Sequence, residues 1–190
     1  MFDKRLSVEK MIELEEKLKH SPLAEIGFAK TDEYLADTLK LEIAVVDDSR
    51  LPRDTEATLT HNSNPDYFGL IQVKETYRRN MFACIHEIIH YVFDVGCGNY
   101  VQGSFERKVR GKTQDAHEQE INYMTAAYSM PLVQFQDAIR DYNGSFPKAD
   151  ELKFVQDLCE RYGQGRESVL RRIREVKRLS KSGKIGNQAL

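Results

Sequence analysis

The spacing of His86 and His90, within the most apolar stretch of the chain, restricts the fold more than any other feature of the sequence. On an α-helix, residues four positions apart share one face, so both imidazoles can reach a single point. The apolar neighbours of these histidines cover almost the whole circumference of such a helix: Met81, Phe82, Ile85, Ile88, Ile89, Val92 and Phe93. A helix that is apolar on nearly every side is a buried one. The sequence therefore predicts two histidines inside a core.

Burying these two imidazoles together with Glu87 costs free energy unless they have partners. A metal ion is such a partner, and two histidines at positions i and i+4 are a common half of a zinc site. In the alternative interpretation, both are core histidines bonded to backbone carbonyls. The string His-Glu-Ile-Ile-His fits the H-E-x-x-H pattern of zinc metallopeptidases, in which the glutamate takes a proton from the activated water. We therefore expect a Zn²⁺ site with Glu87 as catalytic base.

A catalytic zinc ion usually has three protein ligands, so a third must come from elsewhere. A group of ionisable residues begins the next predicted helix: Asp115, His117, Glu118 and Glu120. The apolar periodicity of that helix places Glu120 at the border of its core face and turns Glu118 toward solvent. We expect Glu120 as the ligand, with His117 as the competitor. Each acid can also be an ordinary first-turn residue that stabilises the helix dipole.

The remaining pattern predicts an α+β protein. Apolar spacing, caps and turn residues give the following elements: helices over 7–20, 31–39, 76–95, 114–131, 149–162 and 166–181, and strands over 41–46, 57–61 and 67–74. The turn formers at 62–66 indicate a hairpin between the last two strands. We expect a zincin-like metallopeptidase domain over 1–140, with a small antiparallel sheet packed on the active helix. A helical C-terminal segment over 145–182 and a frayed tail over 183–190 follow.

Charge and cysteine content exclude several classes of protein. The formal net charge of −2 does not favour general nucleic-acid binding, although residues 161–190 carry nine Lys/Arg against two Asp/Glu. Three widely spaced cysteines form no disulfide framework. The first residues lack the apolar region of a secretory signal, and the apolar stretch around 81–95 is too short to cross a bilayer. We expect a cytoplasmic protein with no membrane partner.

Two segments, 78–90 and 118–131, resemble the ImmA/IrrE family of metallo-endopeptidases. Members of that family combine H-E-x-x-H with a later E-A-N-x-F-A-x-x-L-L-M-P motif. The resemblance covers roughly 39–131 and implies that His86, His90 and Glu120 hold the zinc ion, with Glu87 as the base. Departures from the motif concern packing behind the site: Ile121, Met124, Thr125, Tyr128 and Ser129.

The resemblance also implies a function. It indicates a regulated cytoplasmic endopeptidase, often encoded with phages or mobile elements, whose protein substrate is a helix-turn-helix repressor and whose cleavage regulates transcription. The alternative is a non-proteolytic regulator, or an antitoxin-like binding protein, that retains the metal fold. The presence of Glu87 argues against this alternative, because a pure binding role does not require that carboxylate.

Three further expectations concern substrate and partners. The strand containing Gly69, Leu70 and Ile71 is expected to be an edge strand that receives an extended substrate peptide. The oxyanion-stabilising residue is left open among four candidates: Tyr123, His117, Arg107 and Tyr100. The basic C-terminal segment is helix-turn-helix-like in pattern, but Gln164 and Gly165 replace the family's Val-Ser. We therefore expect it to dock on the protein rather than bind DNA.

Overall fold

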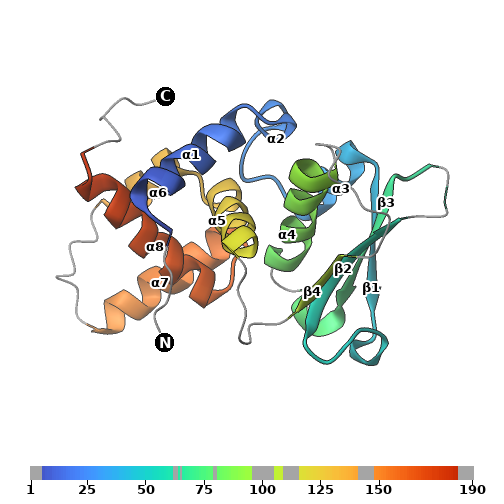
Figure 1. Ribbon diagram of the computed structural model, residues 1–190. Coiled ribbons are helices and arrows are strands. Elements are labelled where there is room, and N and C mark those ends of the chain that lie inside the picture. Colours follow the sequence, from blue (N-terminus) through green and yellow to red (C-terminus); the bar gives the residue numbers. More distant parts are fainter. Residues whose placement is uncertain are drawn as a thin grey trace.

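The computed structural model describes residues 6–61, 64, 66–78, 81–95, 105–108, 116–140 and 148–183. Its elements form successive layers (Figure 1). A four-stranded sheet lies at one end, helix α4 (Phe82–His90) packs on it, and helix α5 (Ala116–Ser129) follows α4. The remaining long helices gather on the far side of α5. The α+β prediction is confirmed, and α4 lies between the sheet and the helical part.

The sheet is mixed. Its strands are β1 (Leu41–Val46), β2 (Thr55–His61), β3 (Gly69–Lys74) and β4 (Phe105–Lys108), in the order β1-β3-β2-β4. The antiparallel pairing of β2 with β3 confirms the predicted hairpin. β1, however, runs parallel to β3, so the expectation of a purely antiparallel sheet is wrong in this detail. A one-turn 3₁₀ helix, Asp48–Arg50, follows β1 and begins the connection that carries the chain to β2.

Two of the amino-terminal helices begin at residues whose side chains cap them. Ser7 caps α1 (Val8–Lys19) by accepting a hydrogen bond from the Lys10 amide, and Thr31 caps α3 (Asp32–Leu39) in the same way. The short helix α2 (Pro22–Ile26) has proline at its first position, where the missing N–H costs nothing. These helices cover α4 and α5 with apolar side chains.

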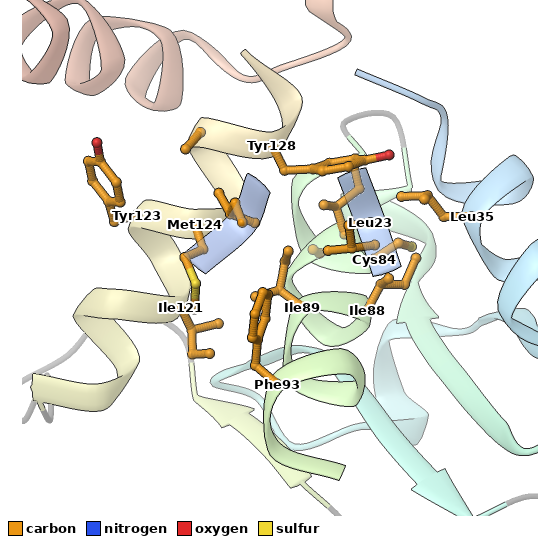
Figure 2. Packing of buried hydrophobic residues seen from close by; sticks show 14 of the residues in the cluster. Leu23, Leu35, Cys84, Ile88, Ile89, Phe93, Ile121, Tyr123, Met124 and Tyr128 are labelled. Atoms are coloured by element: carbon orange, nitrogen blue, oxygen red, sulfur yellow. The ribbon is translucent and has the colours of Figure 1, made fainter. Parts of the chain in front are cut away.

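Helix α4 is buried along its whole length. Figure 2 shows Ile89 and Phe93 facing Ile121 and Met124 of α5, so the two helices share one core. The predicted helix over 76–95 is interrupted: a 3₁₀ turn, Glu75–Tyr77, precedes it, and a π-helical turn, Tyr91–Val95, ends it. π turns inside helices are frequent at functional sites.

Three helices complete the chain: α6 (Leu132–Ile139), α7 (Lys148–Tyr162) and α8 (Arg166–Lys181). They form a second core with residues of α4 and α5, including Phe82 and Ala126, and with Met130, which directly follows α5. A fully buried arginine, Arg172 of α8, donates to Glu15 of α1 at 2.8 Å and to the Met130 carbonyl at 3.0 Å. The C-terminal helices are thus tied to both α1 and α5. No described helix is long and apolar enough to cross a membrane.

Candidate metal centre

The two histidines of α4 meet at their Nε2 atoms. His86 is fully buried and His90 is 4% exposed, and their Nε2 atoms lie 3.1 Å apart. This placement follows from the helix, because positions i and i+4 lie one above the other on the same face. Two unprotonated imidazole nitrogens this close repel each other unless a proton or a cation lies between them. The geometry therefore calls for a positive charge at this point.

Glu118, from the first turn of α5, supplies a third donor. Its carboxylate oxygens lie 3.2 Å from Nε2 of His90 and 3.5 Å from Nε2 of His86. Ligands about 2.0–2.1 Å from a tetrahedral zinc ion are separated by about 3.3–3.4 Å, and the three observed distances bracket that value. Two imidazoles and one carboxylate are also a ligand set that zinc commonly has in hydrolases. The donor set fits a zinc ion.

The sequence-based choice of Glu120 is wrong on this geometry. Its carboxylate lies 3.1 Å from the ammonium of Lys10 on α1, away from the histidines. Residues 118 and 120 point in nearly opposite directions on a helix. The periodicity argument failed because α5 lies between α4 and α1, and residues 121–129 are buried on every side. Apolar spacing therefore could not identify which face of α5 is turned toward the metal site.

Asp94 holds His90 in position, and the sequence reasoning missed it. Its Oδ2 lies 2.6 Å from Nδ1 of His90, and because a carboxylate only accepts, the proton is on Nδ1. That leaves Nε2 of His90 as the atom that can bind a metal. His117 lies on the same carboxylate oxygen, 3.0 Å away, and is half exposed. The available signal was the spacing of Asp94, four residues after His90 in an otherwise apolar helix.

The local electrostatics agree with this arrangement. Although burial favours neutral imidazole, hydrogen bonds that His90 donates to the carboxylates of Asp94 and Glu118 raise its pKa to about 9. Hydrogen bonds from His86 and His90 hold the pKa of Glu118 far below its usual range, and burial opposes them only partly. For Asp94, burial acts to raise the pKa, but the contacts with both histidines lower it overall. The two carboxylates are anionic at neutral pH and favour a cation among them.

Glu87 lies beside this site on α4 and is fully buried. It directly follows His86 in the chain, so it projects from a neighbouring face of the helix, about 100° around. A buried carboxylate next to a metal position is where a proton acceptor for water is needed. The sequence-predicted residues His86, Glu87 and His90 are therefore brought together, with Glu118 as the fourth member.

The predicted substrate strand is not at an edge. Gly69, Leu70 and Ile71 belong to β3, which pairs with β1 on one side and β2 on the other. The expectation that this strand receives a peptide is wrong, because its backbone N–H and C=O groups are already hydrogen-bonded to β1 and β2. The sequence could not show that β1 returns to pair with β3. Within the described strands, the edges are β1 and β4.

The structure describes the side chains of two of the four candidates for oxyanion stabilisation. Tyr123 is buried and donates to Glu15 of α1, so it takes no part in this site. His117 lies beside the site, where its Nε2 is 3.0 Å from Oδ2 of Asp94. Arg107 belongs to β4, but its side chain lies outside the described part of the structure, as does all of Tyr100.

An α+β domain with two histidines one turn apart and a carboxylate from the following helix defines a metallopeptidase-like class of protein. Within that class, the chain belongs to the peptidase family M78, described as the IrrE N-terminal-like domain, whose profile matches residues 51–174. The resemblance to the ImmA/IrrE family is thereby confirmed.

The comparison with solved structures finds a Mycobacterium tuberculosis transcriptional regulator, with 16% sequence identity and a TM-score of 0.45. The match covers 86% of this chain and 46% of the regulator, so the chain spans about half the length of that neighbour. No curated protein matches the sequence.

Proposed function

We propose that this protein is a zinc-dependent endopeptidase in which His86, His90 and Glu118 hold the metal and Glu87 is the general base. The observation that carries the proposal is the mutual placement of three donor groups: the Nε2 atoms of His86 and His90 lie 3.1 Å apart, and the two carboxylate oxygens of Glu118 lie 3.5 and 3.2 Å from them, close to the ligand spacing of a tetrahedral ion. Membership of a peptidase family supports the same reaction class. The third ligand differs from the sequence-based one, but the chemistry is unchanged.

Each residue has a defined task in peptide hydrolysis. When bound, a zinc ion supplies Lewis acidity that acidifies water and polarises the scissile carbonyl. Glu87 accepts the proton of the attacking water and passes it to the leaving amine. Asp94 keeps the proton of His90 on Nδ1, so that Nε2 stays available. Glu118 stays anionic, because its pKa is held low, and neutralises positive charge at the site.

We further propose that the substrate is a protein chain that adds to the edge of β4. β4 pairs with β2 along one of its edges. In the chain it follows the π turn that carries Asp94 and precedes α5, which carries Glu118. Peptides commonly bind proteases as an added strand. The family resemblance indicates a helix-turn-helix repressor as the substrate and cytoplasm as the compartment.

The test compares the native chain with Glu87→Gln, using a helix-turn-helix repressor as substrate. The amide cannot accept a proton, so this variant should fold and keep about one zinc per chain, yet lose cleavage by about 100-fold or more. Elemental analysis and gel electrophoresis of the repressor measure the two quantities. If Glu87→Gln still relieves repression fully in a reporter strain, the protein acts by binding instead, as a non-proteolytic regulator.

A further inference from the structure

A cavity of about 390 Å³ lies between the start of α4 and the turn that joins α7 to α8. It is lined by residues of five segments, among them the 29–31 loop, Ile85, Ser129 and the 160–164 turn. Its size is in the range of small-molecule sites. None of the metal-site residues His86, His90, Glu118 and Asp94 lines it. This cavity is therefore a separate feature from the proposed metal centre.

The walls of this cavity carry buried polar groups that lack partners. Gln164 is 3% exposed, and neither its amide oxygen nor its amide nitrogen has a hydrogen-bond partner in the described structure. The same holds for the hydroxyls of Ser129 and Tyr162, which are 3% and 8% exposed. Buried polar atoms in native proteins are normally satisfied, so such a group beside a cavity indicates a missing partner. The Gln164 amide offers one donor nitrogen and one acceptor oxygen in the same plane. It therefore fits a planar ligand that carries an acceptor and a donor side by side.

The rim of the cavity adds charge. Lys30 and Arg161 are exposed lining residues, and Glu160 is the acidic one among them, so cations outnumber anions. Apolar contact comes from Ala29, Met81 and Ile85. A ligand that matches this lining carries a negative charge at the mouth, a planar ring or chain against the apolar wall, and an amide-type edge for Gln164.

The surrounding backbone is fixed in unusual conformations. Ala29 has a left-handed φ of 57°, which is unfavourable for a residue with a Cβ, and its amide donates to the Tyr128 carbonyl at 3.1 Å. Gly163 has φ 60°, and the Met81 amide donates to its carbonyl at 3.3 Å. These contacts hold the α7–α8 turn on the first turn of α4. The backbone around the cavity is thus held in place by these contacts.

We propose that this cavity, which we name the Gln164 pocket after its buried amide, binds a small organic anion with a planar amide edge. Mononucleotides and short peptides both carry that chemistry, the first through a lactam ring and a phosphate, the second through an amide and a carboxylate. The amide atoms of Gln164 are covered from solvent, so ligand contact requires the side chain to rotate toward the cavity. Binding here contacts the helix that carries His86, but the inference does not depend on the metal site.

Isothermal titration calorimetry of the full chain tests the proposal with two probes, uridine 5′-monophosphate and the dipeptide alanyl-glutamine. Saturable binding of either, at about one site per chain, is expected, and the probe that binds identifies the source of the ligand. Gln164→Leu should weaken binding about tenfold while its Tm stays equal or rises, because an unpartnered buried amide is removed. Gln136→Leu, whose amide bonds to Ser180 away from the pocket, is the matched control and should bind as the native chain does.

A second variant tests the charge at the rim independently of the Gln164 amide. Arg161→Glu changes an exposed residue at the rim and should weaken uridine 5′-monophosphate binding while leaving neutral uridine unaffected. Three results overturn the proposal. They are no binding of either probe at millimolar concentration, unchanged affinity in Gln164→Leu, or a Tm loss in Gln164→Leu of several degrees, which would show a structural role for the amide.

Discussion

Nδ1 of His90 lies 2.6 Å from Oδ2 of Asp94, four residues further along the same chain, where the α-helix has become a π turn. This contact fixes the ring and its tautomer, so the opposite nitrogen faces His86 and Glu118. Carboxylate–histidine pairs of this kind orient metal ligands in many zinc sites. Asp94 therefore belongs to the site although it does not approach the metal position itself.

Asp94→Asn should lower zinc affinity by about 10–100-fold without unfolding the protein. The amide is close in shape to the carboxylate but carries no charge to stabilise the His90 N–H donor. Competition with a chromophoric chelator measures the affinity, and circular dichroism checks the fold. Asp37→Asn, on the exposed side of α3, is the control and should leave zinc affinity unchanged. Native affinity in Asp94→Asn would mean that packing alone orients His90.

The two glutamates of α5 give opposite predictions. Glu118→Ala should lose bound zinc, since it removes one of three donors, whereas Glu120→Ala should keep about one zinc per chain. Glu120 forms an ion pair with Lys10 near the surface, so its loss should change the free energy of unfolding by about 1 kcal/mol or less. Elemental analysis after gel filtration measures both variants. Zinc loss in Glu120→Ala with retention in Glu118→Ala would reverse the assignment.

Glu175 of α8 makes stability depend on pH. Burial raises its pKa from 4.5 to about 6, although Arg172 and Arg171 act to lower it. Arg172 lies 3.8 Å from Glu175 but only 2.8 Å from Glu15, so its charge is mainly matched by Glu15 and burial prevails at Glu175. The folded protein consequently binds more protons than the unfolded chain between about pH 4.5 and 6, and stability falls as pH rises through that window.

Glu175→Gln removes this cost and should raise the free energy of unfolding by up to about 2 kcal/mol at pH 7.5, with the gain disappearing below about pH 4.5. Urea unfolding of both proteins at pH 7.5 and pH 4.5 measures the difference. A stability loss of Glu175→Gln at pH 7.5 would show that the ion pair with Arg172 outweighs desolvation.

The basic helix α8 is expected to bind DNA negligibly at physiological salt. At least three of its cations make contacts within the protein: Arg172 donates to Glu15, Arg174 donates to the Leu170 carbonyl at 3.2 Å, and Arg178 donates to the Leu6 carbonyl at 2.8 Å. Fewer charges are then left to neutralise phosphates. Filter binding to duplex DNA at two salt concentrations measures this, since phosphate contacts give a slope of about one log unit per log of salt for each phosphate. Tight, sequence-selective, salt-sensitive binding would contradict this expectation.

The sequence by itself determined the local features of this protein. His86, Glu87 and His90 follow from a spacing of four residues in an apolar helix, and the helix starts at Ser7 and Thr31 follow from side chains that bond to nearby amides. The hairpin of β2 and β3 follows from alternation and turn residues. All of these depend on residues close together in the chain, where helix and turn geometry are fixed.

Tertiary structure decided which distant residues meet. Glu118 rather than Glu120 faces the histidines because α5 is covered by α4 on one side and α1 on the other, and apolar spacing cannot tell two buried faces apart. β3 is central because β1 pairs in parallel with the edge of β3 that β2 does not occupy. This pairing joins residues some 28 positions apart in the chain. Each outcome reflects packing between elements, which no local pattern encodes.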